Sequence, residues 1–62
     1  MRGNLPTMRT LSAAQVRALH IAFEKGQQDW REGKNVSFYL PGSLYDHMWD
    51  QGWEMERSAH HD

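Results

Sequence analysis

Histidine and carboxylate side chains are the groups in this chain that could hold a metal ion, and several lie near its C-terminus. His60, His61 and Asp62 are consecutive, and His47 precedes them on the chain. A zinc site needs ligands held in tetrahedral geometry, which adjacent histidines in a frayed segment do not provide. The absence of cysteine excludes thiolate ligands, disulfides and thiol nucleophiles. We therefore predict no metal, no cofactor and a disordered tail over residues 59–62.

Three carboxylates at a spacing of four residues form a second candidate group: Asp46, Asp50 and Glu54. On a helix they make one acidic ridge, and like charges at this spacing mildly oppose helix formation. We expect basic residues of another helix to offset the ridge. The candidates are Arg17, Lys25 and Arg31. In the alternative interpretation the ridge is functional, either as a docking edge for a basic protein partner or as a repulsive edge that orients the chain on RNA.

No set of residues suggests catalysis. The sequence holds no nucleophile beside a general base, no glycine-rich phosphate loop and no credible pair of acid–base groups. A chain of 62 residues also has little room to build an enclosed pocket. We predict that the protein is not an enzyme.

The charges are distributed unevenly along the chain. Residues 1–34 contain six basic and three acidic residues, a net charge of +3, whereas residues 35–62 contain one basic and five acidic residues, a net charge of −4. This pattern predicts two oppositely charged elements that pack together. The overall charge of −1 differs from that of a dedicated nucleic-acid binder, which is normally basic.

Ser12 begins the first predicted helix, over residues 12–32. Ser12 and Gln15 fit a capping box, in which the serine hydroxyl and the glutamine side chain each accept a backbone N–H. Gly33 suits the position just past the helix end. Apolar residues and one glycine recur at intervals of three and four residues, which predicts a core face. This face consists of Val16, Leu19, Phe23, Gly26 and Trp30.

Gly26 is unusual in this face, because glycine costs about 1 kcal/mol relative to alanine in a helix interior. We expect another element to approach the helix closely at this point, with Gly52 or an indole of the second helix filling the gap. A kink at Gly26 is the alternative.

Ser43 and Asp46 mark the beginning of a second helix, over residues 44–58. Its predicted core face holds two large rings around a position that has no side chain. The central residues are Trp49, Gly52 and Trp53, continued by Tyr45, Met48 and Glu56 and widened by Leu44 and Met55.

The linker over residues 34–42 ends in Pro41-Gly42, a strong turn signal. Val36, Phe38 and Leu40 alternate with polar and aromatic positions, but a lone strand has no partner in this chain. We expect an extended linker that Phe38 or Tyr39 holds against the helices. The alternative use of these rings is as a platform for stacking nucleic-acid bases.

These elements predict an all-α fold: a two-helix antiparallel hairpin over residues 11–58, with an aromatic linker and a flexible N-terminal arm over residues 1–10. No apolar run is long enough to span a membrane, and the N-terminus lacks the apolar region of a signal peptide. The lack of cysteine fits a reducing compartment. We therefore expect a cytoplasmic protein without membrane partners.

Three parts of the sequence, in order, resemble the ribosome modulation factor family. The first is Ala22 followed by Lys25-Gly26 and then Gly33-Lys34, and the second is the aromatic pair Phe38-Tyr39 in the linker. The third and most specific is Trp49-x-x-Gly52-Trp53 with the acidic Glu54 after it. The resemblance covers about residues 18–57.

The resemblance implies a two-helix protein that binds the small ribosomal subunit in the cytoplasm and promotes the dimerisation of inactive ribosomes. The chain departs from the family in its net charge, since the best-known members are strongly basic. Under this interpretation rRNA would be contacted by the basic residues, with Tyr39 as a stacking ring. The basic residues are Arg9, Arg17, Lys25, Arg31 and Lys34.

Two alternatives remain open from the sequence. The chain could be a small protein–protein interaction module or host-directed inhibitor of phage or mobile-element type, which would use the acidic ridge of the second helix against a basic partner. It could also form a homodimer through exposed indoles.

Overall fold

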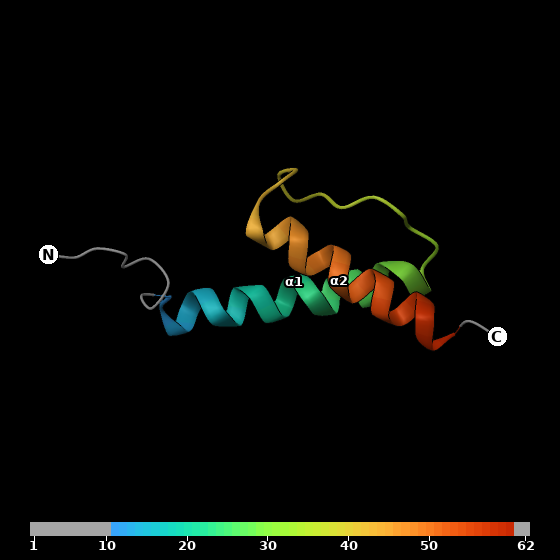
Figure 1. Ribbon diagram of the computed structural model, residues 1–62, viewed down its shortest axis with the longest axis horizontal. Coiled ribbons are helices and arrows are strands. Elements are labelled where there is room, and N and C mark those ends of the chain that lie inside the picture. Colours follow the sequence, from blue (N-terminus) through green and yellow to red (C-terminus); the bar gives the residue numbers. More distant parts are fainter. Residues whose placement is uncertain (1–10, 61–62) are drawn as a thin grey trace, which may run out of the picture.

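In the computed structural model the chain folds into two helices, α1 (Ala13–Arg31) and α2 (Leu44–Ala59), and the structure describes residues 11–60 (Figure 1). Between residues 11 and 60 there is no strand, so the alternation of apolar residues in the linker does not produce one. The all-α class and the packing of two helices against each other are confirmed. The predicted arm over residues 1–10 lies outside the described residues, as do His61 and Asp62.

The ends of α1 follow from local sequence. Ser12 is the N-cap, and its capping box with Gln15 is complete, with hydrogen bonds of 2.9 and 3.1 Å between backbone N–H groups and side-chain oxygens. At the other end Gly33 has a φ of 81°, and the N–H groups of Gly33 and Lys34 donate to the carbonyls of Trp30 and Asp29. This pair of bonds is a Schellman motif, which satisfies carbonyls that the helix leaves free.

The beginning of α2 is set by a turn and a cap. The N–H of Ser43 donates to the carbonyl of Leu40, and Gly42 has a φ of 85°, as a type II turn with proline before glycine requires. The Ser43 hydroxyl then accepts the N–H of Asp46 at 3.1 Å. The predicted Pro-Gly turn and serine cap are therefore both present.

The C-terminal end of α2 is more ordered than the predicted tail over residues 59–62. Ala59 belongs to the helix, and His60 is its C-cap. The His60 ring stacks on Trp30 with 4.9 Å between centroids, and its Nε2 lies 2.9 Å from a Glu56 oxygen. These contacts hold a residue that was expected to be disordered.

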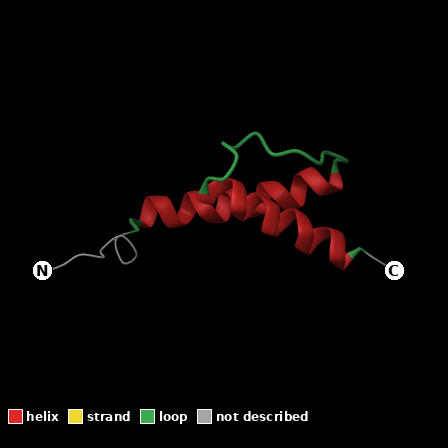
Figure 2. Cartoon of the chain, turned by 45° about the horizontal axis from the view of Figure 1, so that its top comes forward, coloured by secondary structure: helices red, strands yellow, loops and turns green. Residues whose placement is uncertain are grey.

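Both helices run in the same general direction, which corrects the predicted antiparallel arrangement. In Figures 1 and 2, α1 and α2 cross while both proceed toward the C-terminal side of the molecule, and the linker carries the chain back between them. The contacts agree, because Arg31 and Trp30 at the end of α1 meet Glu56 and His60 at the end of α2.

The length of the linker permits this return path. The 12 residues between the helices can span roughly 40 Å when extended. The 16 residues of α2 have a length of about 24 Å. An antiparallel pair needs only a short connection, typically of two to five residues.

The helices cross at Gly26 and Gly52, each of which faces the backbone of the other helix. A Cβ on Gly26 would collide with the Trp49 carbonyl, and one on Gly52 would collide with the Phe23 carbonyl. The α-hydrogens that take the place of these Cβ atoms point at the carbonyls, a weak interaction that recurs where helices pack closely. The expected close approach at Gly26 is confirmed, but backbone rather than an indole fills the gap.

The core is built around this crossing and is centred on small residues. Ala22 and Trp49 are 0% and 4% exposed, and Gly26 and Gly52 are buried beside them. Val16 was predicted to belong to the core, but it is 39% exposed, so that assignment is wrong. The other predicted core residues flank the crossing and are half-buried. They are Leu19, Phe23, Trp30 and Trp53.

The predicted core face of α2 is confirmed at its centre and wrong at its margins. Tyr45, Met48 and Glu56 are half-buried beside the crossing, whereas Leu44 and Met55 are exposed. Because two glycines bring the backbones together, large side chains lie around the contact instead of within it.

Candidate functional site

Asp29 is the most buried charged residue between residues 11 and 60, at 2% exposure. Its Oδ2 accepts the indole N–H of Trp49 at 2.8 Å, and its backbone carbonyl accepts the N–H of Lys34 at 2.8 Å. The Nζ of Lys25 lies 3.3 Å from Oδ1 and forms an ion pair with the carboxylate. Asp29 thereby joins α2, the end of α1 and the beginning of the linker.

The pKa of Asp29 reflects opposing effects. Burial is the largest single effect and raises the pKa, because it disfavours the charged form. The hydrogen bond from Trp49, together with the contact and charge of Lys25 and the charge of Lys34, outweighs burial. The pKa of Asp29 is therefore lower than its ordinary value, and the carboxylate is charged in the folded protein at neutral pH.

Three of the basic residues predicted to contact rRNA are paired with carboxylates of this chain. Lys25 pairs with Asp29, and Arg31 Nη1 lies 3.0 Å from a Glu56 oxygen. Lys34 Nζ lies 3.3 Å from a Glu32 oxygen. Each of these three cations therefore already has a carboxylate partner within the chain.

The other predicted cations differ from these three. Arg17 forms no ion pair with any described residue and lies exposed on the first turns of α1. Arg9 lies outside the described residues. Arg17 is thus the described cation with the most freedom to contact a partner.

Glu56 is the carboxylate that Arg31 contacts. The hydrogen bond with His60 is the largest influence on Glu56 and lowers its pKa, and the contact with Arg31 lowers it further. The expectation that Arg17, Lys25 or Arg31 offsets the acidic ridge is wrong, because Lys25 and Arg31 pair with Asp29 and Glu56 instead.

The residues of the predicted acidic ridge have three different environments. Glu54 pairs with Arg57 of its own helix. Asp46 is half-buried, and its Oδ2 lies 3.4 Å from the Gly42 N–H, a long hydrogen bond. Asp50 is exposed and has no ion pair within residues 11–60. Asp46 and Asp50 are therefore the ridge carboxylates that remain available to a cation.

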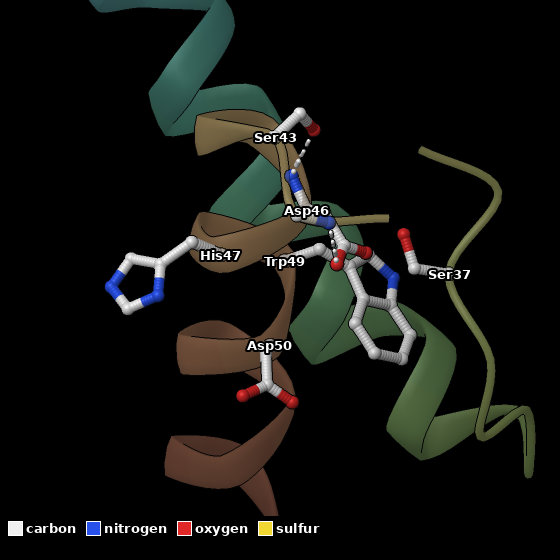
Figure 3. Close-up of a pocket in the computed structure, with 7 residues that line it drawn as sticks. Ser37, Ser43, Asp46, His47, Trp49 and Asp50 are labelled. Atoms are coloured by element: carbon white, nitrogen blue, oxygen red, sulfur yellow. Dashed lines mark hydrogen bonds between the residues drawn. The ribbon is translucent and has the colours of Figure 1, made fainter. Parts of the chain in front are cut away.

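A groove of about 320 Å³ lies between the linker and the first turns of α2 (Figure 3). Asp46 and Asp50 line it, and the Trp49 indole points toward the linker at Ser37, whereas His47 points to the other side of α2. The remaining lining residues are Gly42 and Ser43. The groove combines two carboxylates, two hydroxyls, an indole and an imidazole, and its carboxylates suit a basic side chain.

The aromatic residues of the linker form a stack that ends on α2. The Phe38 and Tyr39 rings are 4.5 Å apart, and Tyr39 and Tyr45 are 6.1 Å apart. Tyr39 therefore lies between two rings, which holds the linker against α2 and leaves little of its surface for stacking a base. Phe38 is 71% exposed, so it is more open to a ligand than Tyr39. The Lys25 ammonium lies 5.9 Å from the centroid of the Phe38 ring.

The apolar residues that alternate along the linker point outward. Val36, Phe38 and Leu40 are 71–75% exposed, whereas Ser37 and Tyr39 are half-buried against the rest of the molecule. Three large exposed apolar side chains within five residues are unusual for a surface that remains in contact with water. The linker is therefore the strongest candidate for a contact surface.

Asp29 and Ala22 were not identified from the sequence as core residues. Ala18, Ala22 and Gly26 recur every four residues, a spacing at which small side chains let another helix approach closely. Asp29 follows Gly26 by three residues on the same face. This small-residue spacing was the signal that could have located the buried face.

No group of three or more potential ligands is placed to hold a metal among residues 11–60, and neither described helix is long and apolar enough to cross a membrane. Comparison with protein-family models, with curated proteins and with solved structures found no match.

Proposed function

We propose that this chain is a non-enzymatic ribosome-binding protein, similar to ribosome modulation factor, that damps translation or promotes ribosome hibernation in the cytoplasm. The observation that supports the proposal is spatial. Gly26, Trp49, Gly52 and Trp53, which carry much of the resemblance to that family, meet at the helix crossing. The part of the resemblance that lies on α1, Gly26, therefore contacts the part that lies on α2.

The exposed cations differ in how easily they could contact rRNA phosphates. Lys25 is committed to the buried Asp29, whose charge would lose its partner if Lys25 turned away. The Lys34–Glu32 pair is exposed on both sides, and such pairs contribute less than about 1 kcal/mol. Arg17 has no described partner. We therefore assign the phosphate contacts to Arg17 and Lys34, with Phe38 as the stacking ring.

Co-sedimentation of the purified chain with ribosomes through a sucrose gradient tests the proposal. The chain should appear in the small-subunit, monosome or ribosome-dimer fractions, and its binding should weaken as salt rises, because phosphate contacts release counterions. Absence from all of these fractions at both low and moderate salt contradicts the proposal.

Matched charge variants sharpen this test. The single variants Arg17→Gln and Lys34→Gln should each weaken binding and reduce its salt dependence. Arg57→Gln is the control for Lys34, because both cations are exposed and both pair with an exposed glutamate. Equal loss of binding in the control would show that net charge alone, and not the assigned surface, controls the interaction.

A second candidate function is that of a protein–protein interaction module or host-directed inhibitor with a basic partner. The specific observation in its favour is the groove, where Asp46 and Asp50 have no cationic partner among the described residues. An affinity experiment that recovers chiefly one non-ribosomal protein, and loses it with Asp50→Lys but not with Glu54→Lys, would favour this function over ribosome binding.

A further inference from the structure

The first turns of α1 are left uncovered by the rest of the described chain. Residues 13–17 are all exposed and lie beyond the beginning of α2, as both views show (Figures 1 and 2). Leu11 just before the helix and Val16 on its second turn are exposed apolar residues, and the exposed Ile21 lies one turn beyond Arg17 on the same face. Arg17 has no ion pair with a described residue. We call this region the projecting end of α1. An isolated helical segment of this length is only marginally stable in water.

The linker and the beginning of α2 form a second uncovered surface. Val36, Phe38 and Leu40 are exposed on the linker, and Leu44 is exposed at the start of α2. The groove with Asp50 lies in the same region. We call this region the linker surface.

The charged residues that lack an ion pair within the described chain differ in sign between the two surfaces: Arg17 is positive, and Asp46 and Asp50 are negative. The described cations other than Arg17 form ion pairs within the chain, and their partners do not include Asp46 or Asp50. The projecting end thus carries an unpaired positive charge among apolar residues, and the linker surface carries unpaired negative charges among apolar residues. Such surfaces are complementary in both charge and hydrophobicity.

The small core makes a partner advantageous. Ala22 and Trp49 are the buried hydrophobic residues between residues 11 and 60, and the chain has no disulfide to support them. Domains of this size usually need a further source of stability, such as a metal, a cross-link or self-association.

We propose that the partner of these surfaces is a second copy of the chain. The projecting end of α1 in one protomer packs on the linker surface of the other, and the reverse contact forms at the same time. This reciprocal arrangement is a closed two-fold dimer, in which Arg17 of each protomer faces Asp50 of the other. It differs from dimerisation through exposed indoles of α2, because Trp49 is buried and the indole N–H groups of Trp49 and Trp53 are bonded within the chain.

Sedimentation equilibrium of the purified full chain, from micromolar to millimolar concentration, tests the proposal without ribosomes. The mass should rise from monomer to dimer with concentration. Arg17→Glu should raise the dissociation constant by about tenfold, because a two-fold dimer loses two exposed charge contacts. Asp50→Arg should have a similar effect, and the combination of both changes in one chain should restore dimerisation.

Two controls separate a specific contact from general effects. Arg57→Glu changes the net charge as Arg17→Glu does, but lies outside both surfaces, so it should leave the dissociation constant unchanged. Ile21→Ser should weaken the dimer, whereas Met55→Ser should not, although both residues are exposed on a helix. Far-UV circular dichroism establishes that each variant keeps its helices.

A monomer mass over the whole concentration range overturns the proposed dimer. It does not contradict the proposed ribosome binding. A dimer that forms equally well with Arg17→Glu, or that the double charge exchange fails to restore, overturns the assignment of these surfaces. Loss of ribosome binding by a chain that still dimerises would instead contradict the proposed function alone.

Discussion

The two halves of α1 share a helical backbone but have opposite surroundings. From Ala22 to Arg31 the helix packs against α2, and Ala22, Gly26 and Asp29 are buried along one face. In the first turns, residues 13–17 are exposed on every side. Yet the Val16 side chain is more hydrophobic than that of Ala22, Gly26 or Asp29.

The difference shows that backbone proximity, more than side-chain hydrophobicity, selects the packed half of this helix. Gly26 and Gly52 allow the two backbones to meet, and the resulting contact excludes water from Asp29 as well as from Ala22 and Trp49. The projecting end has apolar side chains but no such contact. Each of the following predictions compares a change at the crossing with one away from it.

The largest effect is expected for Gly52→Ala. Alanine should favour an isolated helix by about 1 kcal/mol. Here the added methyl group meets the Phe23 carbonyl, which belongs to the backbone and cannot rotate away. We expect a net loss of about 1–3 kcal/mol in the free energy of unfolding, measured by urea denaturation, and a larger loss for Gly52→Leu.

Gly33→Ala is the comparison for this change. No atom lies within 4 Å of a Cβ at Gly33, but its φ of 81° disfavours a side chain. The cost should be about 1 kcal/mol and should come from backbone strain alone. An increase in stability for Gly52→Ala would show that the helices do not meet at Gly52.

The next largest effect is expected for Asp29→Ala. The change leaves the Trp49 N–H without its acceptor and removes the partner of Lys25. A buried donor without a partner costs about 1–3 kcal/mol. Thermal unfolding followed by circular dichroism should show a clear loss of stability, whereas Asp50→Ala, at an exposed position, should change stability by less than about 0.5 kcal/mol.

Acid should weaken the crossing more than the rest of the molecule. Because the pKa of Asp29 is lower in the folded chain than in the unfolded chain, its contribution is complete above about pH 4 and is lost as the pH falls through the folded-state value. Urea denaturation at several pH values between 7 and 2 should show this loss.

Asp29→Asn removes the titrating group and should flatten the acid dependence. A residual slope should remain, since the pKa values of Glu32 and Glu56 are also lowered by their partners. Asp50→Asn should keep the wild-type profile. An unchanged profile for Asp29→Asn would contradict a charged, paired Asp29.

A smaller effect is expected for Trp53→Phe at the margin of the crossing. Trp53 is half-buried, and its indole N–H donates to the Lys34 carbonyl at 2.8 Å. Phenylalanine keeps most of the ring and loses this bond, so the cost should be about 1 kcal/mol by urea denaturation. Trp49→Phe should cost more, because Trp49 is buried and its N–H bonds to a carboxylate.

The smallest effect is expected at the projecting end of α1. Val16→Ala removes exposed methyl groups and gains helix propensity, so the free energy of unfolding of the monomer should change by less than about 0.5 kcal/mol. The measurement should be made at a low micromolar concentration, to exclude self-association. A loss of more than 1 kcal/mol would place Val16 in the core after all.

Local chemistry allowed the helix ends to be predicted from the sequence. The Ser12–Gln15 capping box, the positive φ of Gly33, the Pro41-Gly42 turn and the Ser43 cap are all present as expected. Each involves residues within five positions of one another, so the chain needs no tertiary contact to form them. The pairing of Trp49, Gly52 and Trp53 on one face of α2 follows equally from helical periodicity.

The sequence by itself therefore determined two helices, their caps and the two glycines that mark a close approach. Only the tertiary structure decided that the helices run in the same direction, that Asp29 is buried under Trp49, and that Arg31 pairs with Glu56 of the other helix. The physical reason is the range of the interactions. A 12-residue linker permits either helix direction. The choice depends on backbone contacts and a buried hydrogen bond between residues 20 or more positions apart, which no local pattern encodes.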